Sequence, residues 1–181
     1  MSERLTVRAA RLGDLPIVVD LRLALIREYE SHPFYETLRD DARARAFELY
    51  RTQLTSPYET IFLAEKGRSA VGILRCVETH TSPLLMPERY CYVSSVYVLP
   101  EVRERGVLRA MIDAAMRWCD ERGIPEMRLN NSTSSPAARG AWQALGFDVV
   151  EEVRRRVVRP TKSALAVASS NETAESRAGT R

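Results

Sequence analysis

Hydrophobic and polar residues alternate along the first part of the chain in a pattern that predicts one strand followed by two helices. Leu5–Ala10 has the period of two that is typical of a strand with one buried face. Two segments with the helical period follow, one from Asp14 to the break at His32 and one from about Leu38 to Leu54. Asp14 is the expected N-cap of the first helix, because its carboxylate could accept from the first free amides.

The middle of the chain predicts three more strands. Tyr58–Glu65 and Ala70–Thr79 are rich in apolar and β-branched residues, and the short polar turn between them predicts a hairpin. His80–Glu88 contains two prolines and is expected to be a loop. Tyr90–Val98, which is rich in Tyr and Val and lacks Gly and Pro, is the predicted central strand.

The last third predicts a buried helix, a short strand, a second helix and a final strand. Between Val107 and Cys119 the chain is apolar except for a stripe at helical spacing. The stripe consists of Arg109, Asp113 and Arg117 and continues with Asp120 directly after this segment. Glu126–Asn130 is expected to be a short strand and Asp148–Arg159 the final one. The helix between them should have Ser135 as its N-cap and end at Gly146.

The length and composition of the chain predict one domain with a tail. Residues 1–159 suit a single hydrophobic core. From Pro160 onward the residues become small and polar, so residues 160–181 are expected to form a disordered tail.

Charge, hydropathy and cysteine spacing exclude several classes of protein. The net charge is only +3, and nucleic-acid binding would need a clustered basic face, so no nucleic-acid partner is expected; the run Arg154-Arg155-Arg156 is expected to be an exposed strand edge or face. The chain has no apolar run of membrane-spanning length and no signal region, so we expect a cytoplasmic protein without a membrane partner. Cys76, Cys91 and Cys119 lack metal-ligand spacing and are expected to be buried free thiols.

The loop between the central strand and the following helix has the features of an anion site. Pro100 ends the strand, and Gly106 stands where the helix begins. The first N–H groups of a helix have no partner within it, and the helix dipole places partial positive charge at the same end. Arg103 and Arg105 add positive charge, so this turn is expected to bind phosphate.

This strand and turn resemble the acetyl-CoA signature of the GNAT superfamily of N-acetyltransferases. In that family a V-x-V strand is followed by [RQ]-x-x-G-x-[GA]. The present chain has Val96-Tyr97-Val98 and then R-E-R-G-V-L, from Arg103 to Leu108. Leu108 thus stands where the family has Gly or Ala.

A second segment is similar to the closing motif of the same family, A-x-x-x-Y-x-x-x-G-F. It begins at Ala138 and ends at Phe147, and Trp142 stands where the family often has Tyr. Three residues before Ala138 the family often has Asn, and this chain has Ser135. The two motifs occur in the family's order with one short predicted strand between them, which makes the resemblance far more specific than either motif alone.

The resemblance implies the fold class, the activity and the partners. The fold would be α/β (α+β), with helices flanking a central, mixed but mostly antiparallel sheet in the order β-α-α-β-β-β-α-β-α-β. The protein would be an acyltransferase that uses acetyl-CoA as co-substrate, without a metal, and passes the acetyl group directly to a primary amine of a small molecule or peptide. Homodimers are common in the family. The alternative is a non-catalytic acyl-CoA-binding regulatory module on the same fold.

The resemblance also implies which residues contact the cofactor. Backbone groups of Val96 and Val98 would pair with the pantetheine arm, and amides of the following loop would hold the pyrophosphate. A backbone N–H near Val98 would polarise the thioester carbonyl. The residues expected at the cofactor are Val96, Tyr97, Val98, Arg103, Glu104, Arg105, Gly106, Val107, Leu108, Arg109, Ser135 and Trp142.

The sequence leaves the general base open. An alkyl amine has a pKa near ~10.4, so a base would raise the fraction that can react. Family bases are often acids near the central strand, where this chain has Ser94 and Ser95. The remaining candidates are Glu28, Glu78, His80 and Glu88. Of these, His80 and Glu88 are the preferred catalytic residues, because their loop is expected to flank the substrate side of the central strand.

The group that protonates the leaving thiolate is equally open. Many family members offer a Tyr hydroxyl, but the indole of Trp142 is not a useful proton source, so Trp142 is expected to pack beside the cofactor. The thiolate could leave with help from another group or water. It could also leave unaided, since a thiol has a reference pKa near ~8.5.

Overall fold

The computed structural model describes residues 3–132 and 135–158 of the chain. In order, the elements are β1 (Leu5–Ala9), the 3-10 turn η1 (Leu12–Asp14), α1 (Leu15–Glu28), α2 (Ala42–Leu54), β2 (Glu59–Lys66), β3 (Ser69–His80), β4 (Arg89–Val98), the 3-10 turn η2 (Pro100–Val102), α3 (Val107–Arg122), β5 (Met127–Leu129) and α4 (Pro136–Ala144). The chain divides into two compact units, Met1–Leu145 and Gly146–Arg181, and the first contains every element named here.

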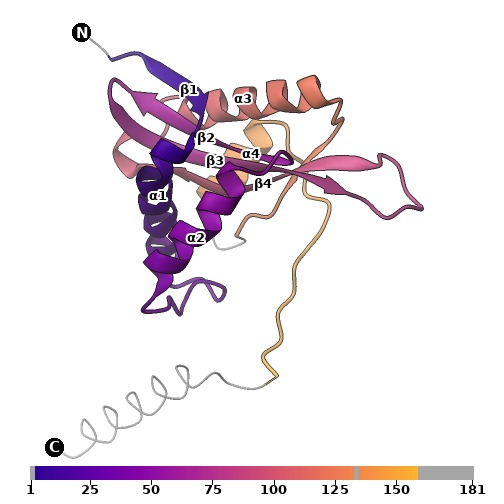
Figure 1. The fold of residues 1–181 in the computed structure, drawn as a ribbon. Coiled ribbons are helices and arrows are strands. Elements are labelled where there is room, and N and C mark those ends of the chain that lie inside the picture. Colours follow the sequence, from indigo (N-terminus) through magenta and orange to yellow (C-terminus); the bar gives the residue numbers. More distant parts are fainter. Residues whose placement is uncertain (1–2, 133–134, 159–181) are drawn as a thin grey trace, which may run out of the picture. The chain divides into compact units, whose positions relative to one another are not determined.

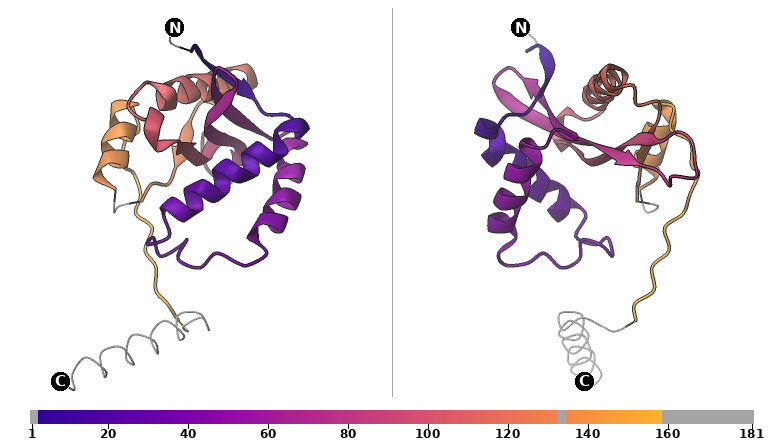
Figure 2. Two further views of the ribbon diagram at one scale, coloured as in Figure 1. Left: turned by 90° about the vertical axis from the view of Figure 1, so that its left-hand side faces the viewer. Right: turned by 45° about the vertical axis from the view of Figure 1, so that its right-hand side comes forward.

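The strands form one five-stranded sheet in the order of the sequence, from β1 to β5 (Figure 1). Each neighbouring pair is antiparallel except β4 and β5, which are parallel because the helix α3 connects them. The views in Figure 2 show α1 and α2 on one face of this sheet and α3 on the other. The predicted mixed, mostly antiparallel sheet with flanking helices is therefore confirmed.

The helices α1 and α2 bury one apolar face each against the sheet. Val18 and Val19 of α1 are fully buried, and Tyr50 of α2 is nearly so. They share a cluster with Ile73 of β3 and Tyr97 of β4, which point to the same face of the sheet. Since burial of one large apolar side chain contributes about 1.5–3 kcal/mol, this cluster holds the end of β4 firmly against α1.

The helix α3 packs on the opposite face through its apolar positions. Gly72 of β3 allows Met111 to approach, since a Cβ at Gly72 would lie 3.2 Å from the sulfur of Met111 and 3.1 Å from the carbonyl oxygen of Tyr97. Beside this contact the free thiols of Cys76, Cys91 and Cys119 are all buried, which confirms the prediction made for them. The predicted polar stripe of α3 lies on its exposed side.

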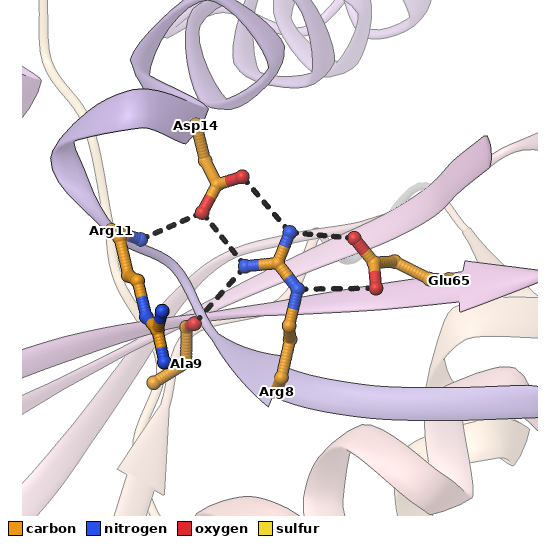
Figure 3. A network of polar contacts seen from close by, with 5 residues as sticks. All are labelled: Arg8, Ala9, Arg11, Asp14 and Glu65. Carbon is orange, nitrogen blue, oxygen red and sulfur yellow. Dashed lines mark hydrogen bonds and ion pairs between the residues drawn. The ribbon is translucent and has the colours of Figure 1, made fainter. Parts of the chain in front are cut away.

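A network of charged side chains ties β1, η1 and β2 together (Figure 3). The guanidinium of Arg8 donates to both carboxylate oxygens of Asp14, at 2.7 and 2.9 Å, and to Glu65 at 2.6 Å. The expected N-cap bond from the Asp14 side chain to α1 is absent. The carboxylate instead accepts from the amide of Arg11 at 2.7 Å, and the hydrogen bond from Arg8 holds the pKa of Asp14 at about 2.

Most of the predicted elements are present, with small shifts at their ends. The helix expected from Leu38 begins at Ala42. The predicted hairpin of β2 and β3 turns at Gly67, which has a φ of +62°. The hydroxyl of Ser135 accepts from the amide of Ala138 at 3.3 Å, which confirms its predicted role as the N-cap of α4.

The predicted final strand, Asp148–Arg159, is wrong over the residues that the structure describes. Residues 148–158 contain no strand, and all of them are exposed. Val150 and Val158, whose side chains are 90% and 87% exposed, bury almost no apolar surface. The β-branched valines of this segment suit a strand, but without a neighbouring strand nothing pairs its backbone groups or covers one face. Arg159 and the expected tail, residues 160–181, lie outside the described residues.

Candidate cofactor site

The strands β4 and β5 stay together for only three register pairs. Pairing runs from Cys91 and Met127 to Val93 and Leu129, and β5 ends there. β4 continues to Val98 without a partner on that side among the described residues. From Ser94 onward, β4 therefore has one open edge with unpaired backbone groups.

Two residues on this edge turn their backbone groups outward. The amide of Leu99 donates to the carbonyl of Val71 on β3 at 2.9 Å. Because the peptide is planar and trans, the carbonyl of Val98 points the opposite way, toward the open edge. The groups of Val96 face the same edge by alternation along the strand. The structure thus brings both residues to an edge that an extended ligand could join as a further strand.

A β-bulge lies where β4 leaves β5. Arg75 pairs with Ser94 and Ile73 pairs with Tyr97, so β4 has two residues opposite one of β3. Within the bulge Ser95 has a φ of +52°, the left-handed region that residues with side chains rarely adopt. A bulge bends the strand that contains it, which is consistent with the separation of β4 from β5 at this point. A strained backbone such as that of Ser95 persists only where the surrounding structure holds it.

The cofactor loop, residues 103–106, follows β4 and η2 and leads into α3. Glu104 and Gly106 both have left-handed backbone, and no side chain caps the helix at Gly106. In the described part of the chain no hydrogen bond reaches the amide N–H groups of residues 104–109; the first bond of the helix is that from Ala110 to Gly106, at 3.0 Å. These free amides and the positive end of the helix dipole suit a phosphate group.

The arginines of this region differ in what they contact. Arg103 donates to the Glu28 carboxylate at 2.6 Å and to the carbonyl of Val98 at 2.9 Å. Arg109 reaches the carbonyl of Ala144 at the end of α4, at 3.4 Å. Arg105 is exposed and has no ion pair among the described residues, so its charge is available to an anion at the loop.

The other residues expected at the cofactor lie on β4, α3 and α4. Tyr97 is buried against α1, and burial and then the Glu28 carboxylate raise the pKa of its hydroxyl. Val107 is buried and Leu108 is half-buried at the start of α3. Trp142 is half-buried on α4. Cofactor contact by these side chains stays a prediction.

The four candidate bases fall into two groups. Glu28 is paired with Arg103, and Glu78 accepts from Arg89 at 2.6 Å. His80 and Glu88 are exposed at the far end of the β3–β4 hairpin, where they line a cavity of about 420 Å³.

The hairpin end is distant from the open edge of β4. His80 is the register partner of Arg89, and Val96 lies seven residues further along the strand, or roughly 23 Å at ~3.3 Å per residue. The structure therefore does not bring His80 and Glu88 to the cofactor loop, and their catalytic role stays a prediction.

A half-buried ion pair beside the bulge was not anticipated from the sequence. Arg75 of β3 donates to Glu59 of β2 at 2.6 Å and to the hydroxyl of Ser94 at 3.5 Å. Burial, followed by the nearby hydroxyl of Tyr35, raises the pKa of Tyr92 on the same strand as Ser94. The charge of Arg75 between apolar strand residues was visible in the sequence, but its partner Glu59 was not, because the two meet only when β2 and β3 pair.

Two further features of the described residues bear on function. They contain no cluster of His, Cys, Asp and Glu side chains that could hold a metal ion. A search of their helices found none with both the length and the hydropathy needed to cross a membrane.

Comparisons with known proteins identify the family of the chain. An aminoglycoside N(6')-acetyltransferase type 1 from Salmonella typhimurium is 36% identical over 62 residues, which are 34% of this chain and 43% of that protein. The alignment thus spans less than half of this relative.

Solved structures cover the chain more fully. Aminoglycoside N-acetyltransferase AAC(6')-Iy in complex with CoA superposes with a TM-score of 0.70 and 25% identity, over 88% of this chain and 98% of that one. A predicted acetyltransferase with acetyl-CoA from Clostridium acetobutylicum shares the fold, with a TM-score of 0.71, 17% identity and coverage of 86% and 97%. The sequence matches the Acetyltransferase (GNAT) family over residues 23–147. The chain therefore belongs to the GNAT acetyltransferase family.

Proposed function

We propose that the protein is an acetyl-CoA-dependent N-acetyltransferase that transfers the acetyl group directly to a primary amine. The observation that carries this proposal is the presence of two backbone features side by side at the end of β4. They are the open edge of β4 after Val93 and the free amides of residues 104–109. Family membership and the likeness to an acetyltransferase structure that contains CoA support the same reading.

Acetyl-CoA fits the chemistry of these groups. The pantetheine arm carries amides that can pair with Val96 and Val98 as a strand would. Its pyrophosphate is an anion, which suits the loop amides, the start of α3 and the exposed guanidinium of Arg105. The backbone contacts are made by main-chain atoms, so a substitution affects them only where it changes the conformation of the chain.

The transfer itself needs a neutral amine. Its nitrogen attacks the thioester carbonyl carbon, the C–N bond forms, the C–S bond breaks and CoA leaves as the thiolate. A backbone N–H near Val98 would stabilise the negative charge that develops on the carbonyl oxygen. The proton released from the amine passes to water or to a base, and we expect that His80 and Glu88, which lie at the hairpin end, do not take it directly.

Protonation of the thiolate does not require a side chain from α4. Trp142 stands where the family often has Tyr, and its indole is a poor acid. A thiolate with a reference pKa near ~8.5 is a good leaving group, and water can protonate it after the transfer.

The acceptor in this proposal is a small-molecule amine. Aminoglycosides are the first class to test, because relatives of the chain have names that include them. A peptide amine is the second class. A homodimer and a cytoplasmic location belong to the same proposal, and light scattering of the purified protein tests the former.

Thermal unfolding with and without acetyl-CoA tests the cofactor site. At a ligand concentration about 100-fold above Kd, specific binding adds roughly 2.7 kcal/mol to the free energy of unfolding, which corresponds to a shift of about 5–10 °C. No shift at millimolar acetyl-CoA would overturn the proposal.

A second measurement separates an enzyme from a binding module. Free CoA thiol is followed with a thiol reagent while a panel of aminoglycosides, polyamines and peptides is supplied. Release that depends on the amine supports the transferase. A thermal shift without release from any amine supports the non-catalytic acyl-CoA-binding module, which Ser94 and Ser95 favour because they stand where an acid is common.

A further inference from the structure

We propose that the ion pair between Arg103 and Glu28 holds the cofactor loop in the conformation that receives the pyrophosphate. Both are thus positioning residues for acetyl-CoA. This inference rests on the proposed function and deepens it, because it assigns part of the cofactor affinity to a contact between residues 75 positions apart.

The guanidinium of Arg103 makes three contacts, one with α1 and two with β4. Its Nη2 donates to Oε2 of Glu28, the last residue of α1, at 2.6 Å. Its Nε donates at 2.9 Å to the carbonyl of Val98, the last residue of β4. Its carbon Cζ lies 5.7 Å from the centre of the Tyr97 ring. One side chain therefore joins α1, β4 and the start of the cofactor loop.

The position of Glu28 is poor for the stability of its own helix. The C-terminal end of a helix carries partial negative charge, so a carboxylate at the last residue of α1 is repelled by it. The side chains of Arg103 and Glu28 are 41% and 31% exposed, and ion pairs with this exposure add little to the free energy of unfolding. The pair is better explained by the local conformation that it fixes.

That conformation is strained immediately after Arg103. Glu104 has a φ of +61°, which costs free energy for any residue with a Cβ and persists only where neighbours hold it. Arg103 is the residue directly before it and is fastened at two points. Without the pair, the loop can relax into conformations in which its amides no longer converge on one anion.

The contact with Val98 adds a second effect on the cofactor. The carbonyl of Val98 faces the open edge of β4, so Arg103 covers the end of that edge. The N–H of Val98 and the backbone groups of Val96 stay available to a strand-like ligand, and the guanidinium at the Val98 carbonyl marks how far that ligand can extend. The pair thus fixes the position of the cofactor loop relative to the open edge of β4.

The test compares acetyl-CoA affinity by calorimetry in the full chain and its variants. Glu28→Gln keeps the shape of the side chain and should raise Kd about five-fold, and Arg103→Ala about ten-fold or more. The double variant should bind no more weakly than Arg103→Ala, because the interaction is already lost. Arg103→Lys should fall between wild type and Arg103→Ala, since an ammonium keeps the charge but cannot bridge both partners.

A matched control lies on the same helix. Asp20 of α1 also pairs with a distant arginine, Arg43, and Asp20→Asn should leave the acetyl-CoA affinity unchanged. In steady-state kinetics Glu28→Gln should raise KM for acetyl-CoA while kcat at saturation stays within about two-fold. A purely structural role would instead lower the melting temperature without changing KM.

The outcomes separate this inference from the proposed function. If the wild type binds acetyl-CoA and Glu28→Gln binds it equally well, the inference is overturned and the proposed function stands. If the wild type does not bind acetyl-CoA, both are overturned. Weaker binding by Asp20→Asn to the same degree also overturns the inference, because the effect would then belong to α1 as a whole.

Discussion

Glu104 and Gly106 hold left-handed backbone on either side of Arg105, with φ angles of +61° and +78°. Glycine adopts this region at no steric cost, whereas residues with a Cβ are strained there. The cofactor loop therefore contains one residue that suits its conformation and one that does not. Its shape depends on Gly106 and on the contacts that hold Glu104.

Gly106→Ala should lower the free energy of unfolding by about 1 kcal/mol and weaken acetyl-CoA binding at least about ten-fold. A Cβ at this position would meet nothing within 4 Å, so the effect comes from backbone strain and not from a clash. Urea unfolding and the thermal shift with acetyl-CoA measure the two effects.

Gly140→Ala is the matched control for this substitution. Gly140 lies inside α4, and a Cβ there also has open space, but its φ is not positive. Alanine has the higher helix propensity, so this variant should gain about 0.5–1 kcal/mol and bind acetyl-CoA normally. Changes of the same sign in both variants would contradict the argument from backbone conformation.

Asp14→Asn should lower the free energy of unfolding by about 2 kcal/mol at pH 7, because the carboxylate that binds Arg8 and the Arg11 amide loses its charge. The pKa of Asp14 is lowered to about 2 in the folded protein. Its contribution is therefore present above the unfolded pKa, near ~3.9, and is lost as the pH falls through about 2.

Urea unfolding of wild type and Asp14→Asn at pH 7, 4 and 2.5 checks this sign. The difference between the two proteins should shrink as the pH falls. Glu48→Gln, which removes an exposed pair with Arg51, should change stability by less than about 0.5 kcal/mol at any of these values. A difference for Asp14→Asn that is independent of pH would exclude the carboxylate charge as its cause.

His80→Ala and Glu88→Gln should each keep kcat/KM within about three-fold of wild type, because general-base catalysis requires a side chain within hydrogen-bond reach of the amine or one water away. The two residues lie at the hairpin end, far along β4 from Val96. Rates with the best acceptor across pH 6–9 test this. A loss of ten-fold or more, together with a changed pH profile, would establish the side chain concerned as the base.

The elements of this fold could be predicted from residue patterns because most of them bury one face. The helix α3 buries its apolar residues at the helical period, whereas β2 and β3, which are covered on both faces, are marked by short continuous apolar runs. The segment 148–158 shows the limit of such patterns. Its valines are β-branched and suit a strand, yet a strand also needs a partner for its backbone, and a partner is a property of the fold rather than of the segment.

The candidate site could be predicted only in part, because local patterns identify its turn but not the contacts between distant residues. The position of the phosphate-binding turn followed from a glycine at the start of a helix. The partner of Arg103 did not, because local spacing carries no information about a carboxylate 75 residues earlier. Glu28 appeared in the sequence only as one of several acids that could act as a base. Arg75 and Glu59 escaped notice for the same reason, since they are joined only when β2 and β3 pair.

The free amides of residues 104–109 and the outward backbone of β4 also bear on how such proteins can be found. A site made from main-chain atoms is specified by backbone torsion angles, and the identity of an amino acid matters only where it restricts those angles. Leu108 can therefore replace a small residue while its amide keeps its place at the start of α3. A search that compares backbone torsion angles around a bulged strand and a left-handed turn would detect sites of this kind even after substitutions in the sequence motif.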